Sequence, residues 1–158
     1  MFSAVFNYRF PEKKLYLFDT FEGFAEQEAQ KELEQMRCNE YFIEAHKDTS
    51  VERMLKRLPF PQKAVVCKGF FPDSITEEAK KEKFAFVSLD VDFEESTLEG
   101  LKFFYPRLSE GGYIFIHDYN TFYLEGIKEA VRRYEAYLGQ KLKCVPIADR
   151  AGTLIIVK

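Results

Sequence analysis

Short apolar runs alternate with stretches of helical periodicity along the chain. A short apolar run bounded by polar residues indicates a buried strand, whereas apolar residues that recur every three or four positions indicate an amphipathic helix. These patterns predict strands at residues 15–18, 41–45, 64–67, 84–89, 113–116, 142–147 and 153–157. They predict helices over residues 25–36, from Thr49 or Ser50 to Leu58, and over residues 76–82, 94–108 and 123–138.

The order of these elements predicts an α/β fold and a single domain over residues 1–158. Strands that alternate with helices form parallel βαβ units, so we expect a mostly parallel sheet. The last two strands flank residues 149–152, whose sequence DRAG is a turn signal, and therefore predict a C-terminal antiparallel hairpin. The helix over residues 25–36 is rich in Glu, Gln and Lys and is expected to be exposed, with Leu33 and Met36 as its main apolar contacts.

Acidic residues and a histidine follow two of the predicted strands. Asp90 and Asp92 come directly after one strand, and His117 and Asp118 come directly after the next. A helix joins these two strands, so their carboxyl ends lie on the same edge of a parallel sheet, where open α/β sheets bind their ligands. We therefore expect these four side chains to lie close together, and carboxylates with an imidazole can hold a divalent cation.

The same residues also have structural interpretations. Asp90 and Asp92 could cap the helix that follows them, and His117 could be a hydrogen-bonded residue at a strand end. A metal-dependent hydrolase that activates water at this edge is a further hypothesis, although no motif in the sequence is specific for it.

Two other strand ends carry candidate ligand-binding residues. Asp19 is placed to accept hydrogen bonds from the ribose hydroxyls of a nucleotide, or to cap a turn. Gly69 allows a ligand to approach the backbone closely, and Phe70 could lie against an adenine ring. The alternative for this loop is a turn glycine followed by two core aromatic residues, Phe70 and Phe71.

Composition excludes several function classes. The net charge is −3 and there is no basic run, which argues against nucleic-acid binding. We find no signal peptide or membrane-spanning stretch, so we expect a cytoplasmic protein without a membrane partner. Cys67 and Cys144 lie in strand-like runs and are expected to be buried, and Cys38 has no metal-ligand spacing to either. The aromatic segment at residues 122–124 suggests a covered surface, as in a homo-oligomer.

Four sequence blocks resemble the macrocin-type (TylF-like) O-methyltransferases. They are residues 15–24 (LYLFDTFEGF), 68–74 (KGFFPDS), 89–97 (LDVDFEEST) and 111–119 (GGYIFIHDY), and their order and spacing agree with the family. The resemblance covers nearly the whole chain and implies a Rossmann-like methyltransferase sheet with a C-terminal antiparallel hairpin. It also implies S-adenosylmethionine as cofactor, a divalent metal, and a small-molecule acceptor such as a sugar hydroxyl.

The resemblance assigns roles to individual residues. Asp90 and Asp118 would bind the metal, and Asp90 would also be the base or orienting group. Because carboxylate oxygens are hard ligands, the metal implied by these two residues is Mg²⁺. His117 stands where the family commonly has Asp, so it would either shift preference toward a transition ion or act as general base. The residues expected to face the cofactor are Asp19, Thr20, Phe21, Gly69 and Phe70.

The sequence departs from the family at its N-terminal end. Residues 2–10 correspond to the helix after the family's first strand and glycine-rich loop, and no glycine precedes Gly23. Either the chain is a fragment, or the family's second and fourth strands pair directly, or another subunit fills the gap. This departure motivates an alternative function, in which a catalytically degenerate methyltransferase fold serves as a binding or assembly module.

Overall fold

The computed structural model describes residues 10, 12–45, 48–121, 124–150 and 152–158. These residues form two compact units. One unit lies within residues 1–26 and 40–80, and the other lies within 27–39 and 81–158. The expectation of a single domain over the whole chain stays a prediction.

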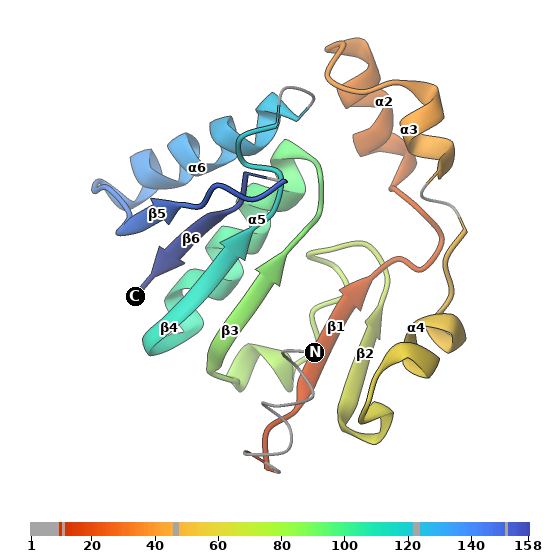
Figure 1. Cartoon of the computed structure of the whole chain (residues 1–158), viewed down its shortest axis with the longest axis vertical. Coiled ribbons are helices and arrows are strands. Elements are labelled where there is room, and N and C mark those ends of the chain that lie inside the picture. The colour runs from red at the N-terminus through yellow and green to blue at the C-terminus, as the bar shows by residue number, and fades with distance from the viewer. Residues whose placement is uncertain (1–9, 11, 46–47, 122–123, 151) are drawn as a thin grey trace. The chain divides into compact units, whose positions relative to one another are not determined.

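The first unit contains a two-stranded parallel sheet (Figure 1). Strand β1 (Leu15–Asp19) pairs with β2 (Ala64–Lys68), and Asp19 stands opposite Lys68 at the carboxyl ends. Between these strands the chain forms α3 (Glu40–Ala45), α4 (Val51–Arg57) and the 3-10 turn η1 (Pro61–Lys63). Both predicted strands are confirmed, and so is the predicted cap of α4, because the Ser50 hydroxyl accepts a hydrogen bond from the Arg53 amide.

The second unit is built on a four-stranded sheet of order β3-β4-β6-β5. Strand β3 (Phe84–Leu89) runs parallel to β4 (Leu108–Ile116), and β6 (Leu154–Val157) runs antiparallel both to β4 and to β5 (Cys144–Pro146). The antiparallel pair of β5 and β6 confirms the predicted C-terminal hairpin.

The described residues of the second unit include three α-helices. They are α2 (Glu26–Glu34), which begins at the boundary between the units, α5 (Glu94–Phe104) and α6 (Glu125–Leu138). Figure 1 shows α5 and α6 behind the sheet in this view, so they cover the same face of it, and they pack against each other. The 3-10 turns η2 (Ala79–Lys81) and η3 (Tyr105–Arg107) precede β3 and β4. 

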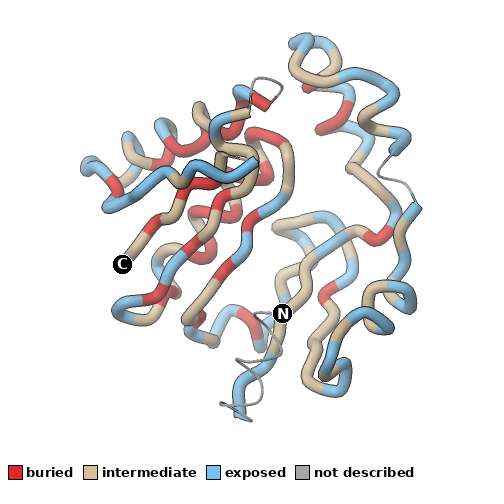
Figure 2. The backbone as a smooth tube through the Cα atoms, viewed as in Figure 1, coloured by how far each residue is buried: buried red, intermediate tan, exposed pale blue. Residues whose placement is uncertain are grey.

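The hydrophobic core of the second unit lies between its sheet and these two helices. Figure 2 shows the buried positions concentrated along β3, β4, α5 and α6. Its largest fully buried side chains include Phe93, Leu101, Ile114, Ile116, Ile127, Tyr134, Leu154 and Ile156. Burying one such side chain stabilises the fold by about 1.5–3 kcal/mol. The core therefore fixes β3 and β4. Their carboxyl ends are followed by Asp90, His117 and Asp118, which together are called the acidic edge.

Several sequence predictions about secondary structure are wrong. Residues 41–45 form helix α3, which satisfies its backbone hydrogen bonds internally and needs no neighbouring strand. The predicted helix over residues 76–82 is reduced to the turn η2. Gly111 and Gly112 do not separate a helix from a strand, because β4 runs through both of them. The register of β4 against β3 shifts between Leu108 and Tyr113, and Gly111 within this irregular part of the strand has φ 70°.

Two predictions about burial are also wrong. The face of α2 that carries Glu28 and Glu32 is buried, whereas Met36 is 90% exposed, because this helix binds its neighbours through charged groups. Cys67 is buried as expected, but Cys144 is exposed on the edge strand β5.

Two further predictions fall wholly or partly outside the described residues. Residues 1–9, expected to continue a helix, and residues 122–123 of the aromatic segment lie outside the described residues, while Leu124 is buried. Direct pairing of the family's second and fourth strands stays a prediction.

Candidate active site

Asp90, His117 and Asp118 converge at the carboxyl ends of β3 and β4. The His117 Nδ1 atom lies 3.0 Å from an Asp90 carboxylate oxygen and 2.7 Å from an Asp118 carboxylate oxygen. One potential ligand atom from each of the three residues lies within 4.8 Å of the others. The predicted meeting of these residues at one sheet edge is confirmed.

The strand register explains this convergence. Leu89 of β3 pairs with Ile116 of β4, and the His117 amide donates a hydrogen bond to the Leu89 carbonyl, 3.0 Å away. Parallel pairing thus continues to the residues immediately before the acidic side chains. The side chains of Asp90, His117 and Asp118 are 57%, 44% and 20% exposed, so the group is open to an incoming ion or ligand.

The electrostatics of the group favour a cation. Partial burial lowers the pKa of His117, but the hydrogen bond that its ring donates to the Asp118 carboxylate and the charges of Asp90, Asp118 and Asp92 outweigh burial and raise this pKa overall. Asp92, the fourth residue expected at this edge, thus acts on His117 electrostatically. A protonated Nδ1 is one way to hold two carboxylates together, and a divalent cation shared by all three residues is another.

Two of the acidic residues have unusual backbone conformations. Asp92 has φ 61° and Asp118 has φ 54°, in the left-handed region where aspartate is one of the few tolerated residues. Such conformations cost about 1–3 kcal/mol each and cluster at functional sites. Thr121 stabilises the turn at Asp118, because both its amide and its hydroxyl donate hydrogen bonds to the Asp118 carbonyl.

The predicted cofactor-facing residues lie at the carboxyl ends of β1 and β2 in the first unit. The Gly69 amide donates to the Asp19 carbonyl at 3.0 Å, so the two predicted loops are adjacent. An Asp19 carboxylate oxygen accepts the Phe21 amide at 2.6 Å, and the Thr20 hydroxyl donates to the Gly23 carbonyl. Asp19 therefore caps a turn, which was the structural alternative, and its role toward a ribose stays a prediction.

The aromatic residues of these loops differ in exposure. Phe21 is buried at 6% exposure, whereas Phe70 is 38% exposed. Phe70 is thus the ring that a planar ligand could contact without rearrangement. Gly69 has φ 138°, a conformation that residues with a Cβ rarely adopt, and an added Cβ would lie 3.3 Å from the Ser74 Cβ. The Gly69 backbone is therefore specific to glycine, and close approach of a ligand at this position stays a prediction.

Sequence reasoning missed a charged network that holds the N-terminus of α5. Both carboxylate oxygens of Glu28 accept hydrogen bonds from Ser96, from its amide at 2.8 Å and from its hydroxyl at 2.6 Å. Phe93, at the N-cap position of α5, supplies no side-chain cap, so Glu28 caps this helix from another one. Glu28 and Glu32 lie on one face of a helix rich in Glu, Gln and Lys, a spacing that is typical of an exposed surface and does not indicate a partner.

Cations surround the two glutamates that begin α5. Arg133 of α6 contacts Glu94 at 2.6 Å and Glu95 at 2.8 Å, Lys31 contacts Glu95 at 2.8 Å, and Arg37 pairs with Glu94. Hydrogen bonds from Arg133 and Lys31 lower the pKa of Glu95 to about 2. The segment of α5 that directly follows the Asp90–Asp92 loop is thereby fixed to α2 and α6.

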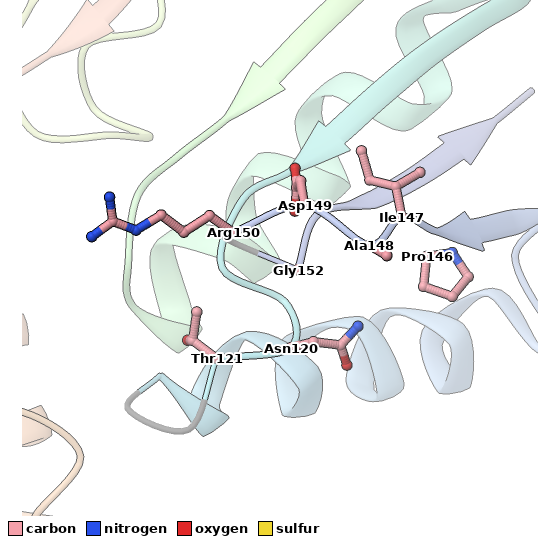
Figure 3. Close-up of a pocket in the computed structure, with 8 residues that line it drawn as sticks. All are labelled: Asn120, Thr121, Pro146, Ile147, Ala148, Asp149, Arg150 and Gly152. Carbon is pink, nitrogen blue, oxygen red and sulfur yellow. The ribbon is translucent and has the colours of Figure 1, made fainter.

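A pocket of ≈ 570 Å³ opens beside the acidic edge, between the turn after β4 and the loop that joins β5 to β6 (Figure 3). Its lining residues are Asn120, Thr121, Pro146, Ile147, Ala148, Asp149, Arg150 and Gly152. The Asn120 amide donates to the Gly152 carbonyl at 3.1 Å and joins the two walls. His117 is close enough to contribute to the lowered pKa of Asp149, whose main cause is hydrogen bonding by Thr153.

Solved structures share this architecture. The chain aligns with the O-methyltransferase NovP at a TM-score of 0.68 and 22% identity, over 92% of this chain and 60% of that one. It aligns with CalS11, a calicheamicin methyltransferase, at a TM-score of 0.72 and 16% identity, over 99% of this chain and 65% of that one. The fold is therefore that of a Rossmann-like methyltransferase, as predicted.

The sequence identifies the family within this fold. Residues 1–149 match the family described as Macrocin-O-methyltransferase (TylF), and the chain belongs to it. A Streptomyces olivaceus enzyme, 8-demethyl-8-(2,3-dimethoxy-alpha-L-rhamnosyl)-tetracenomycin-C 4'-O-methyltransferase, is 34% identical over 85 residues, which are 54% of this chain and 30% of the enzyme. The chain thus spans less than two thirds of the length of these relatives. Among its described residues, no helix is long and apolar enough to cross a membrane.

Proposed function

We propose that the chain acts in S-adenosylmethionine-dependent methyl transfer to a hydroxyl group of a sugar or another small molecule, assisted by a divalent cation. The observation that carries this proposal is the convergence of Asp90, His117 and Asp118 at the sheet edge of a TylF-family fold. The Streptomyces olivaceus relative, whose substrate carries a rhamnosyl group, supports the acceptor class.

The donor set fits a divalent cation. Two carboxylates and an imidazole with ligand atoms within 4.8 Å of one another suit a metal with mixed oxygen and nitrogen ligands. Such a cation, when bound, lowers the pKa of a hydroxyl group near it and favours the nucleophilic alkoxide. Because the imidazole is a softer ligand than the Asp common in the family, Mn²⁺, Fe²⁺ or Zn²⁺ would be preferred to Mg²⁺.

The residues of the chain would position the acceptor and take its proton. Asp90 is the base or orienting group, since its carboxylate is exposed at the sheet edge and is held 3.0 Å from His117. His117 would take this role if it does not bind the cation, because its raised pKa makes it a stronger proton acceptor than an ordinary histidine. Asp118, the least exposed of the three, would hold the cation on the buried side.

The first unit would contact the cofactor. Asp19 and Thr20 would face its ribose, and Gly69 and Phe70 would face its adenine, with Phe21 packing beneath the loop. The adjacency of the two loops supports this assignment, because the Gly69 amide and the Asp19 carbonyl are hydrogen-bonded. The alternative of a binding or assembly module without catalysis predicts a folded chain that binds neither cofactor nor metal.

Calorimetric titration tests the proposal. The chain is titrated with S-adenosylmethionine with and without Mg²⁺ or Mn²⁺, and methyl transfer is then measured with sugar acceptors. We expect cofactor binding in the micromolar range and metal binding that Asp90→Ala abolishes while the fold is preserved. Asp48→Asn is the matched control, since Asp48 is exposed and lies in the first unit. Unchanged metal binding in Asp90→Ala would contradict the assignment, and a folded chain that binds no cofactor would favour the binding module.

A further inference from the structure

The pocket beside the acidic edge has two walls, which the hydrogen bond from the Asn120 amide to the Gly152 carbonyl joins and which further hydrogen bonds stabilise from within. On one wall, Thr121 is bound through its amide and hydroxyl to the Asp118 carbonyl. On the other, the Asp149 carboxylate accepts the Thr153 amide at 2.9 Å and the Thr153 hydroxyl at 2.7 Å. These bonds fix the pocket relative to Asp118, so a ligand in the pocket has a defined position relative to the candidate metal centre.

An added side chain would not fit where the two walls meet. Gly152 has φ 60°, and a Cβ on it would lie 2.6 Å from the Asn120 Cβ and 3.1 Å from the Asn120 Cα. Contacts below 3.0 Å require a shift of the backbone, because the opposing atoms belong to a turn that is itself hydrogen-bonded. The close approach at Gly152 is thus what sets the spacing of the walls.

The lining of the pocket is chemically divided. Pro146, Ile147 and Ala148 form an apolar end that could pack against the C–H face of a sugar ring. Figure 3 shows Arg150 at the opposite end of the pocket from Pro146, with its side chain extended. Arg150 is exposed, and no ion pair to it is found in the described part of the chain.

Charge around the pocket makes Arg150 distinctive. Asp90, Asp118 and Asp149 are acidic and repel anions, so Arg150 is the pocket-lining group that can attract one. A planar guanidinium matches the geometry of a phosphate group and binds it through two parallel hydrogen bonds. An acceptor with a phosphate at one end and neutral hydroxyls at the other would be oriented by this division of charge.

We propose, on the basis of the proposed methyl transfer, that this pocket binds the acceptor sugar and that Arg150 selects acceptors that carry a phosphate group. A sugar phosphate and a nucleotide-linked sugar share this chemistry. The ring would lie against the apolar end, with a hydroxyl group toward Asp118. Arg150 is a specificity-determining residue in this arrangement, because it contacts a part of the acceptor remote from the methylated oxygen.

NMR titration of the isotopically labelled chain tests the proposal. The probes are glucose 1-phosphate, UDP-glucose and methyl β-glucoside, and the signals followed are the amides of Asn120 and Gly152. We expect both phosphorylated probes to bind about tenfold more tightly than the glucoside, as for a charged hydrogen-bonded pair. Equal affinity for glucose 1-phosphate and UDP-glucose would show that one phosphate is recognised, and tighter UDP-glucose would show recognition of the nucleotide-linked form.

Two variants and one control complete the test. Arg150→Gln should reduce binding of both phosphorylated probes to the level of the glucoside, whereas Arg132→Gln, an exposed arginine of α6, should leave it unchanged. Gly152→Ala should weaken the binding of all three probes, because the added methyl group pushes the two walls of the pocket apart. Equal affinity for all probes, equal behaviour of the two arginine variants, or shifts confined to other residues would overturn the proposal. Metal binding is measured on the same samples, to separate this proposal from the proposed function. A chain that binds the phosphorylated probes but no metal would contradict the proposed function and leave the role of Arg150 standing.

Discussion

Glu28 accepts two hydrogen bonds from Ser96, a residue 68 positions later in the chain. The bond to the Ser96 amide satisfies a donor in the first turn of α5 that has no partner within its own helix. A buried carboxylate on α2 thus serves as the cap of α5, the helix that begins directly after the acidic loop.

Removing this cap should destabilise the second unit. Glu28→Ala leaves the Ser96 amide buried without an acceptor, which costs about 1–3 kcal/mol in the free energy of unfolding. Glu28→Gln should cost much less, since its amide oxygen can accept from the Ser96 amide while its NH₂ donates to the hydroxyl. Urea denaturation measures both, with the exposed Glu34→Ala on the same helix as control. Equal effects of Glu28→Ala and Glu34→Ala would exclude the capping role.

The same residue should make stability depend on pH. Burial outweighs the Ser96 hydrogen bonds and raises the pKa of Glu28 above its usual 4.5. The folded chain then retains a proton that the unfolded chain has lost, so the contribution of Glu28 is complete below pH 4.5 and declines as the pH rises through the folded pKa. Glu28→Gln should remove this decline, so the variant gains relative to the parent as the pH rises. A constant difference between them from pH 4 to 8 would refute the prediction.

The ion pair of Arg133 with Glu95 should give a pH dependence of the opposite sign, with stability that is lost in acid. The hydrogen bonds from Arg133 and Lys31 lower the pKa of Glu95 from 4.5 to about 2, so the stability it contributes is present above pH 4.5 and is lost as the pH falls toward 2. Glu95 is 37% exposed, and solvent limits this contribution to about 1 kcal/mol. Arg133→Gln should weaken the acid dependence, measured by urea unfolding at pH 3 and 7, whereas Arg132→Gln should leave it intact.

Metal preference should follow the imidazole at position 117. The chain is expected to bind Mn²⁺ or Zn²⁺ at least about tenfold more tightly than Mg²⁺, because nitrogen ligands favour transition ions. His117→Asp should bring the affinities closer by weakening transition-ion binding more than Mg²⁺ binding. Calorimetry with each ion measures the ratio directly, and an unchanged ratio in His117→Asp would show that the imidazole is not a ligand.

The tight contact between Gly100 and Leu89, the residue before Asp90, should couple helix packing to the proposed metal binding. A Cβ at Gly100 would lie 2.6 Å from the Leu89 Cδ1, and Leu89 is the buried residue directly before Asp90. Gly100→Ala should therefore displace the end of the Leu89 side chain and weaken metal affinity, while the higher helix propensity of alanine, about 1 kcal/mol, offsets part of the overpacking cost. Glu99→Ala on the same helix is the control, and metal affinity that is unchanged in a destabilised Gly100→Ala would separate the two effects.

The acidic edge was predictable from the sequence because it depends on local patterns. Two apolar runs joined by a helix specify a parallel pair, and residues after parallel strands must share an edge, which placed Asp90 beside His117. The cap of α5 was not predictable in this way. Nothing in the spacing of Glu28 specifies a partner on another helix, and a carboxylate pattern on one helical face is usually solvated.

The strand prediction at residues 41–45 failed for a related reason. A short run with Tyr, Phe and Ile favours a strand by propensity, but a strand requires a partner, and a helix does not. The pocket was also beyond the sequence, since its spacing depends on the positive φ of Gly152 and on a contact with Asn120 from a different loop.

The interleaving of the two units along the chain has a consequence for synthesis on the ribosome. Helix α2 emerges early. Ser96, the hydrogen-bond partner of its Glu28, and Arg133, the ion-pair partner of Glu94 in α5, emerge much later. Until then Glu28 and Glu32 remain in water as ordinary charged side chains, and the helix has little apolar surface of its own to hold it together. The second unit can therefore close only when translation has passed α6, which makes its assembly a late event governed by contacts that are distant along the chain.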